Sequence, residues 1–333
     1  MRLARICASL LMIAVAFVAA RSDAAEPVPF KIGIAAPTVN MLPLWIGQAS
    51  GVFAAHGLNV EIVNTDGGSR GLAEVGQGKL QAMTVGLSAV IDANGKGGDY
   101  RLIASGANTM SFRFFGAKRI TDADSLKGKK IGVSAFGSES DSAALLALKQ
   151  LGLARGDVSI VEAGGTLKRL DALKSGAIAA TALNEPADTQ AQRDGLPLLA
   201  DLKANLPWIF TAIVVDRKYL QSHRAEVKEF LRAYIESIYL ALSNPQRGML
   251  TLADQFKGVP VEVIEATYAD FKARVPRDAA PSREGAETML RELPGLGVAV
   301  KSKNPSDYID SSLIEELRSD GFLDGVTKRY QVY

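Results

Sequence analysis

The sequence predicts an α/β protein made of two similar lobes. A strand-loop-helix-strand unit occupies residues 30–71, the same order of segments returns at 130–162, and the segment after 217 has helical patterns without strands. Strands that alternate with helices form parallel or mixed sheets with helices on their faces. The repeated unit therefore predicts two lobes that face each other, with the C-terminal helices packed on lobe one.

The opening unit begins with a predicted strand at 31–35, followed by a proline-rich break and an apolar helix at 44–53. Gly57 ends this helix, and a second strand follows at 58–63. That strand runs into a loop at 65–69 that contains two glycines at the start of the next helix. A plain connection between strand and helix explains such a loop, but its backbone N–H groups also suit an anionic or polar ligand.

The second unit has a strand at 130–133, a loop of small polar residues, a helix at 142–151 and a strand at 158–161. A further strand is predicted at 178–183, and it ends in the loop Asn184-Glu185-Pro186. In sheets of this class, ligands bind outside the carboxyl ends of the strands. The loops at these strand ends are therefore the predicted ligand contacts.

The chain is expected to cross between the lobes twice. The strand at 112–117 and the charged run at 118–130 form the first predicted crossing, and the apolar strand at 209–215 forms the return. The predicted organisation is a signal peptide at 1–25, the first part of lobe one at 26–117, lobe two at 118–209, and the return crossing with the C-terminal helices at 210–333.

The N-terminus has the composition of an export signal. Arg2 and Arg5 precede an apolar run at 10–18, and small residues follow, which predicts cleavage near Ala25. The apolar run is too short to be a permanent membrane span. The only cysteine, Cys7, lies inside this signal, so the mature chain has no disulfide and no thiolate site. An exported chain of this kind fits the periplasm.

Composition narrows the class of partner. Charged residues make up 22% of the 333 residues, and the net charge is +2. No basic stripe indicates nucleic acid or a membrane surface, so a small molecule is the expected partner. The two histidines, His56 and His223, lie in ordinary helix-end or turn contexts, and no metal spacing or catalytic triad is recognisable. We therefore predict no enzyme activity, no metal and no cofactor.

Several short motifs, in a specific order along nearly the whole mature chain, resemble a known family. They are LPLWI at 42–46, GVF at 51–53 followed by GLNVE at 57–61, GG at 67–68, LKGKKIGV at 126–133, LGL at 151–153, and ALKSGAI at 172–178 with EP at 185–186. This set resembles the solute-binding proteins of nitrate, sulfonate and taurine ABC importers, a group also called NMT1-like. Related pyrimidine-precursor binding proteins share the pattern.

The resemblance implies a type II-like periplasmic binding fold, with two hinge strands, that closes on its ligand. It also implies a monomer that delivers a sulfonate, a taurine-like compound or a related organic acid to a membrane permease and its ATPase. Three alternatives stay open at this point. They are a binding protein for an aminopyrimidine or an aromatic acid, an enzyme of the pyrimidine-precursor synthase type, and a sensory protein that docks on a receptor.

The predicted ligand contacts come from the loops of both lobes. Lobe one is expected to contribute Thr38, Asn40, Leu42, Trp45, Gly67, Gly68, Ser69, Arg70, Leu87 and Ser88. Lobe two is expected to contribute Phe136, Gly137, Ser138, Glu139, Asn184 and Glu185.

Some of these residues also have ordinary structural explanations. Trp45 lies on an apolar helix and suits a core position, and Arg70 can point to solvent. Glu139 and Glu185 lie near helix starts, where the helix dipole stabilises an acid without any functional role. If both carboxylates face the cleft they repel a sulfonate, whereas a ligand with an acid and a hydrogen-bond donor satisfies the site. The sequence leaves the ligand open.

Overall fold

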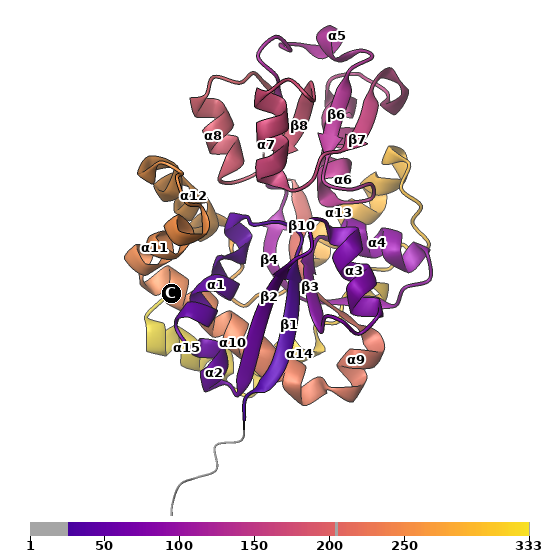
Figure 1. Cartoon of the computed structure of the whole chain (residues 1–333). Coiled ribbons are helices and arrows are strands. Elements are labelled where there is room, and N and C mark those ends of the chain that lie inside the picture. The colour runs from indigo at the N-terminus through magenta and orange to yellow at the C-terminus, as the bar shows by residue number, and fades with distance from the viewer. Residues whose placement is uncertain (1–25, 204–205, 333) are drawn as a thin grey trace, which may run out of the picture.

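The computed structural model describes residues 26–203 and 206–332, and these form two α/β lobes, the second above the first in Figure 1. The predicted signal peptide at 1–25 lies outside the described residues. Each lobe contains one five-stranded sheet. In spatial order, the first sheet consists of β2 (Leu58–Asn64), β1 (Val28–Ile34), β3 (Ala82–Val85), β10 (Pro207–Asp216) and β4 (Tyr100–Thr109). The second consists of β7 (Ser159–Glu162), β6 (Lys130–Val133), β8 (Ala180–Leu183), β5 (Arg113–Gly116) and β9 (Leu198–Asp201).

The two sheets follow one plan. In the first, β1 is parallel to β2 and β3, and β10 runs antiparallel to β3 and β4. In the second, β6 is parallel to β7 and β8, and β5 runs antiparallel to β8 and β9. In each sheet, the strand in the fourth position therefore arrives by a crossing from the other lobe. This shared plan confirms the two similar α/β lobes that the repeated unit predicts.

Helices cover both sheets and complete the fold. The first lobe contains η1 (Val39–Met41), α1 (Leu42–Ala49), α2 (Val52–Ala55), α3 (Gly68–Gly76) and α4 (Leu87–Gly95). The second contains α5 (Ala123–Leu126), α6 (Glu139–Gln150), η2 (Arg155–Asp157), α7 (Thr166–Lys174) and α8 (Ala187–Arg193). The C-terminal segment contains α9 (Arg217–Ser222), α10 (Arg224–Ser243), α11 (Pro245–Gln255), α12 (Val261–Arg274), α13 (Arg283–Glu292), η3 (Leu293–Leu296), η4 (Pro305–Asp307), α14 (Ser312–Ser319) and α15 (Phe322–Tyr330).

Local details differ from the sequence prediction. The helix predicted over 44–53 is two helices, α1 and α2, because Gly51 between them adopts a left-handed conformation with φ of 73°. The strand β9 has no counterpart in the prediction. None of the helices in the described parts of the chain is both long and apolar enough to cross a membrane.

The first crossing also lies earlier than the sequence indicates. The predicted first part of lobe one, 26–117, includes the strand at 112–117 as the start of the crossing, but β5 pairs with β8 and β9 of the second sheet. The chain therefore leaves lobe one between β4 and β5. Sheet membership depends on partners far away along the chain, which a local pattern does not reveal. The return strand β10 pairs with β4 from Pro207 onward, close to the expected position.

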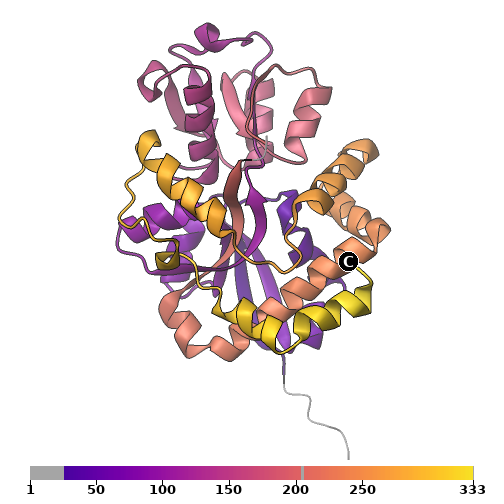
Figure 2. The ribbon, with the colours of Figure 1, turned by 180° about the vertical axis from the view of Figure 1, so that it is seen from behind.

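The C-terminal helices pack mainly on lobe one, as expected, and Figure 2 shows them along the back of that lobe. Phe230 of α10 stacks on Phe30 of β1 with ring centroids 4.4 Å apart. A second core crosses between the lobes and includes Val90 of α4, Leu148 of α6 and Met289 of α13. Apolar packing therefore joins the two lobes.

Candidate ligand-binding site

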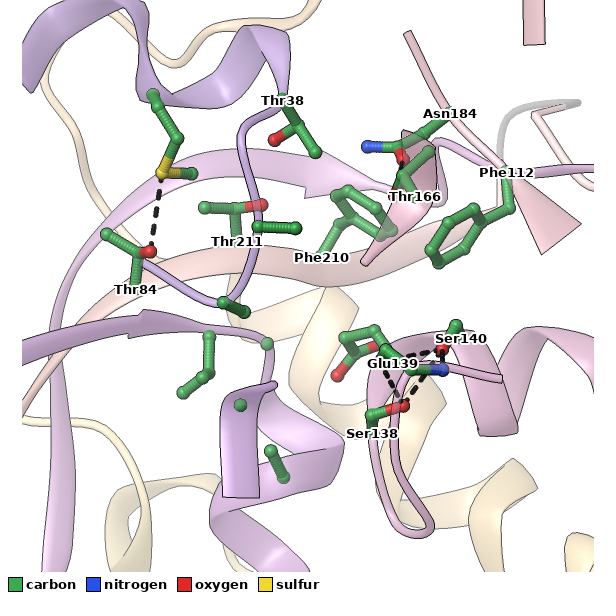
Figure 3. A pocket seen from close by; sticks show the side chains of 18 of the residues that line it. Thr38, Thr84, Phe112, Ser138, Glu139, Ser140, Thr166, Asn184, Phe210 and Thr211 are labelled. Atoms are coloured by element: carbon green, nitrogen blue, oxygen red, sulfur yellow. Dashed lines mark hydrogen bonds between the residues drawn. The ribbon is translucent and has the colours of Figure 1, made fainter. Parts of the chain in front are cut away.

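A largely apolar cavity between the lobes lies at the carboxyl ends of β1, β3, β6 and β8 (Figure 3). It offers about 80 Å³ to water-sized molecules. One buried water needs about 10–15 Å³ by the same measure, so a small organic solute fits. The residues around the cavity are Ala35, Ala36, Thr38, Met41, Gly68, Thr84, Val85, Gly86, Ala89, Phe112, Ser134, Ser138, Glu139, Ser140, Thr166, Arg169, Asn184, Phe210 and Thr211.

Hydroxyl groups cluster on the lobe-two side of the cavity. The Oγ atoms of Ser134, Ser138 and Ser140 lie 2.9 Å from one another. Ser138 also caps α6, where its hydroxyl accepts the N–H of Asp141. Ser134 and Ser138 lie in the loop between β6 and α6, and Ser140 lies in the first turn of α6, so the helix cap and the cavity wall are built by the same few residues.

Asn184 forms another polar part of the wall. Its side-chain carbonyl accepts the hydroxyl of Thr166 at 3.0 Å. Within the described residues, no protein acceptor binds the amide NH2 group of Asn184, which Figure 3 shows beside Thr166. A buried amide favours a partner for each N–H. The cavity therefore presents an amide donor to a ligand.

Arg169 of α7 supplies a positive charge to the cavity. Its guanidinium donates to the carbonyls of Gly164 and Ala182 and to the hydroxyls of Thr181 and Thr166. Among the described residues, no carboxylate lies within ion-pair distance of it. Burial lowers the pKa of Arg169 to about 9, so it stays protonated at neutral pH. Neutral groups alone hold this buried cation, and an anion in the cavity would compensate its charge.

Glu139 of α6 brings the opposite charge to the same cavity. Its Oε1 accepts the N–H of Ser88 at 2.9 Å and also the Ser88 hydroxyl, and its Oε2 accepts the indole N–H of Trp208 at 2.7 Å. Both donors belong to lobe one, so this carboxylate joins the lobes. Burial raises the pKa of Glu139 to about 7, against the effect of these hydrogen bonds.

The apolar part of the wall includes two phenylalanines that Figure 3 labels. Phe112 and Phe210 meet edge to face, with ring centroids 4.8 Å apart and an interplanar angle of 78°. They come from the two segments that connect the lobes. Aromatic surface beside charged and hydroxyl groups suits a ligand that has an acidic end and an apolar body.

Several predicted contacts lie on the cavity wall. They are Thr38, Gly68, Ser138, Glu139 and Asn184. All five lie at or just after strand ends, where a local pattern locates them. Asn40 lies directly behind the wall, since its amide donates to the hydroxyl of the wall residue Thr211 at 3.3 Å.

Other predicted residues lie inside the protein core. Leu42, Trp45 and Leu87 are buried in apolar clusters, and Trp45 packs edge to face on Phe256, which follows the last residue of α11. The ring centroids of that pair are 5.7 Å apart. These helices turn their apolar faces to the C-terminal helices or to the interlobe core. That packing explains why these three residues do not line the cavity.

The remaining loop residues close the mouth of the cleft or face away from it. Ser69 donates to the backbone carbonyl of Phe136 across the mouth at 3.4 Å, and Ser88 binds Glu139. The side chains of Arg70 and Phe136 are exposed. Gly67 and Gly137 are not among the cavity residues.

Glu185 belongs to a separate charge cluster at the hinge, which we define as Glu185, Asp188, Lys203 and Asp270. The Nζ of Lys203 lies 3.0 Å from Glu185 Oε1, 2.7 Å from Asp188 Oδ2 and 3.3 Å from Asp270 Oδ1. Burial opposes the charge on Glu185, but the Lys203 ammonium outweighs it and lowers the pKa of Glu185. Burial and the neighbouring Glu185 raise the pKa of Asp188. Glu185 therefore faces the hinge, not the ligand cavity.

The prediction missed several wall residues, among them Arg169, Thr166, Thr84 and Thr211. One signal was available in the sequence, because Gly164 and Gly165 precede α7 just as Gly67 and Gly68 introduce α3. Applying the same rule would have found Thr166. Arg169 lies in the first turns of that helix, and only the packing of α7 on β8 turns its side chain inward.

Comparisons with known proteins give a consistent result. The family model described as NMT1/THI5 like matches residues 38–248. No curated protein sequence matches the chain. Among solved structures, the chain is similar to the alkanesulfonate-binding protein SsuA from Xanthomonas axonopodis pv. citri bound to MOPS. The identity is 18%, the similarity covers 86% of this chain and 99% of that one, and the TM-score is 0.71.

The chain is also similar to two further solved structures. The periplasmic nitrate-binding protein NrtA from Synechocystis PCC 6803 is 15% identical over 89% of each chain, with a TM-score of 0.73. The desulfurization enzyme DSZB is 16% identical over 91% of this chain and 99% of its own, with a TM-score of 0.55. The fold is thus the two-lobed periplasmic binding protein fold, and binding proteins are prominent among its structural neighbours. With the family model matching well over half of the sequence, the chain belongs to the NMT1/THI5-like family.

Proposed function

We propose that this protein is the periplasmic substrate-binding component of an ABC importer. It captures a small organic anion between its lobes, a sulfonate, a taurine-like compound or a related organic acid, and delivers it to a membrane permease and its ATPase. The observation that carries the proposal is Arg169, a buried cation on the cavity wall that has only neutral protein partners within the described residues. The alkanesulfonate-binding and nitrate-binding neighbours support the same class of ligand.

The geometry suggests how such a ligand is held. Its acid accepts N–H groups from Arg169 and Asn184 and hydroxyls from the nearby threonines, which replaces the water lost on burial. Its apolar part lies against Phe112 and Phe210. Because these residues come from both lobes and from the connecting segments, a bound ligand stabilises the closed form over an open one.

The test is thermal melting of the purified protein against a panel of alkyl and aryl sulfonates, taurine, nitrate, aromatic carboxylates and aminopyrimidines. A ligand present at about 100 times its dissociation constant adds about 2.7 kcal/mol to the free energy of unfolding. We expect an organic anion to raise the melting temperature of the natural protein and to leave that of Arg169→Met unchanged. A panel in which only neutral compounds stabilise the protein would contradict the proposal.

Two observations favour alternatives. The phenylalanine pair also suits an aminopyrimidine or an aromatic acid, which the same panel separates from aliphatic sulfonates. The family description and the DSZB neighbour favour an enzyme on this fold. Mass spectrometry of each stabilising compound after long incubation with the protein distinguishes the two classes. A binding protein returns the compound unchanged, whereas an enzyme converts it.

A further inference from the structure

The cavity contains two places that stabilise negative charge. One is the Arg169 guanidinium, and the other is the N-terminus of α4, which begins at Leu87 beside the wall residue Gly86. The first N–H groups of a helix have no partner inside the helix, and the helix dipole makes that end partly positive. An acid group that enters the cavity could therefore be stabilised at either place.

The protein fills the second place with its own carboxylate. Oε1 of Glu139 accepts both the backbone N–H and the hydroxyl of Ser88 in the first turn of α4. Oε2 accepts the indole N–H of Trp208, which is fully buried. The carboxylate thus has donors on both oxygens, although it is anchored in α6 of the opposite lobe.

Gly86 shows how closely this carboxylate is fitted. A Cβ atom built on Gly86 would lie 2.2 Å from Oε1 of Glu139, which is far inside contact distance. The φ of Gly86 is −84°, which any residue adopts, so the backbone conformation does not require glycine here. Glycine is required at position 86 because the Glu139 side chain occupies the space that a Cβ atom would fill. The absence of a side chain at Gly86 therefore makes room for the carboxylate of Glu139.

Glu139 has no cationic partner to balance its charge within the described residues, since its hydrogen bonds come from neutral donors. Its negative charge therefore acts on whatever enters the cavity. A first acid group is compensated by Arg169, but a second one finds the α4 N-terminus occupied and a like charge beside it. Like charges placed together at a site are a strong means of rejecting a ligand.

We propose that Glu139 is a specificity-determining residue that makes the cleft selective for ligands with a single acid group and excludes those with two. This inference rests on the proposed function, because it assumes that an organic anion binds at Arg169. The protein supplies the second anion of the cavity itself. The ligand consequently binds in one orientation, with its acid toward Arg169 and its uncharged end toward Glu139.

The experiment measures dissociation constants by calorimetry at pH 8.5, where Glu139 is ionised, for two matched pairs of probes. These are ethanesulfonate with 1,2-ethanedisulfonate, and butyrate with succinate. We expect the natural protein to bind the monoanion of a pair at least about 100-fold more tightly than the dianion. Glu139→Gln keeps the size of the side chain and its contact with Ser88, and we expect it to reduce that ratio at least about tenfold by gaining affinity for the dianion.

The matched control is Glu162→Gln, which removes the same charge from lobe two outside the cavity, where the carboxylate accepts the N–H of Phe136. Its ratio should equal that of the natural protein. If Glu139→Gln does not fold, Glu139→Ala gives the same test, because it also frees the N-terminus of α4. Circular dichroism establishes that each variant is folded.

The outcomes separate the two proposals. Equal binding of both members of a pair by the natural protein overturns the role of Glu139 and leaves the proposed function standing. An unchanged ratio in the folded Glu139 variants does the same. If no anion binds to the natural protein or to any variant, both the proposed function and the selectivity are wrong.

Discussion

The cavity and the hinge cluster both contain buried or half-buried charges, but the two regions differ in how these charges are compensated. At the hinge, the Lys203 ammonium has three carboxylates within 3.3 Å. In the cavity, Arg169 and Glu139 are held by neutral groups within the described residues. Charges that the protein compensates itself serve the structure, whereas charges that it leaves uncompensated are available to a ligand.

The position of the two regions fits this difference. The hinge cluster joins α8 of the second lobe to α12 of the C-terminal segment through Lys203, which follows β9. It lies beside the segments that connect the lobes, where a fixed geometry is useful. The cavity lies where the strands of both lobes end, so polar groups from both lobes line it. Four changes test the comparison, from the largest expected effect to the smallest.

Lys203→Met should have the largest effect on stability. Asp188 keeps Arg113 and Asp270 keeps Arg274, but buried Glu185 loses the cation that lies beside it, and removing one partner of a buried ion pair costs about 3–5 kcal/mol. Urea denaturation followed by circular dichroism measures the loss. The matched control is Lys174→Met, which removes an exposed lysine paired with Asp194 and should cost less than about 1 kcal/mol. Similar losses in both variants would show that the hinge cluster is not the structural element described above.

Arg169→Met should destabilise the ligand-free protein less than Lys203→Met does. No carboxylate loses its partner, but the carbonyls of Gly164 and Ala182 lose a buried donor, so we expect a cost of about 2 kcal/mol. Urea denaturation without ligand measures this difference. A loss as large as that of Lys203→Met would mean that Arg169 is mainly a structural residue.

Glu139 should make stability depend on pH. Burial raises its pKa from the ordinary 4.5 to about 7, so between these values the folded state binds more protons than the unfolded state. The free energy of unfolding therefore falls as pH rises through this window, and the contribution is lost above about pH 7. Because the side chain is partly exposed, we expect about 1–2 kcal/mol rather than the full value for the shift.

The measurement for this prediction is the difference in unfolding free energy between the natural protein and Glu139→Gln at several values from pH 4.5 to 7.5. Other groups titrate in both proteins, so the difference isolates Glu139. It should change steadily in favour of the Gln variant as pH rises. A difference that is constant with pH would contradict the raised pKa.

Lys168→Ala should have the smallest effect. Lys168 forms an exposed ion pair with Asp66 at 2.7 Å across the mouth of the cleft, and such pairs contribute less than about 1 kcal/mol. The loss should shrink further in 0.5 M NaCl, because salt screens exposed charges. Denaturation at low and high salt measures both values. A larger loss of unfolding free energy that salt does not reduce would show that this pair stabilises the fold as the hinge cluster does.

The sequence by itself determined the two-lobed α/β plan and most strand and helix positions. It also located the strand-end residues that line the cavity, which are Thr38, Gly68, Ser138, Glu139 and Asn184. These features follow from local periodicity, from glycine and proline breaks, and from the rule that ligands lie at strand ends. Each of these features is visible in a short stretch of sequence. The repetition of the same order of segments then predicts the second lobe.

Only the tertiary structure decided which face of each element meets the cavity. Trp45 lies in the core because α11 covers it, and β5 joins the second sheet because β8 and β9 flank it. Glu185 turns to the hinge because Lys203 lies there, whereas Arg169 turns into the cavity with no acid beside it in the described structure. In each case the partner comes from a distant part of the sequence. Burial, charge compensation and strand pairing depend on such partners, so local patterns do not reveal them.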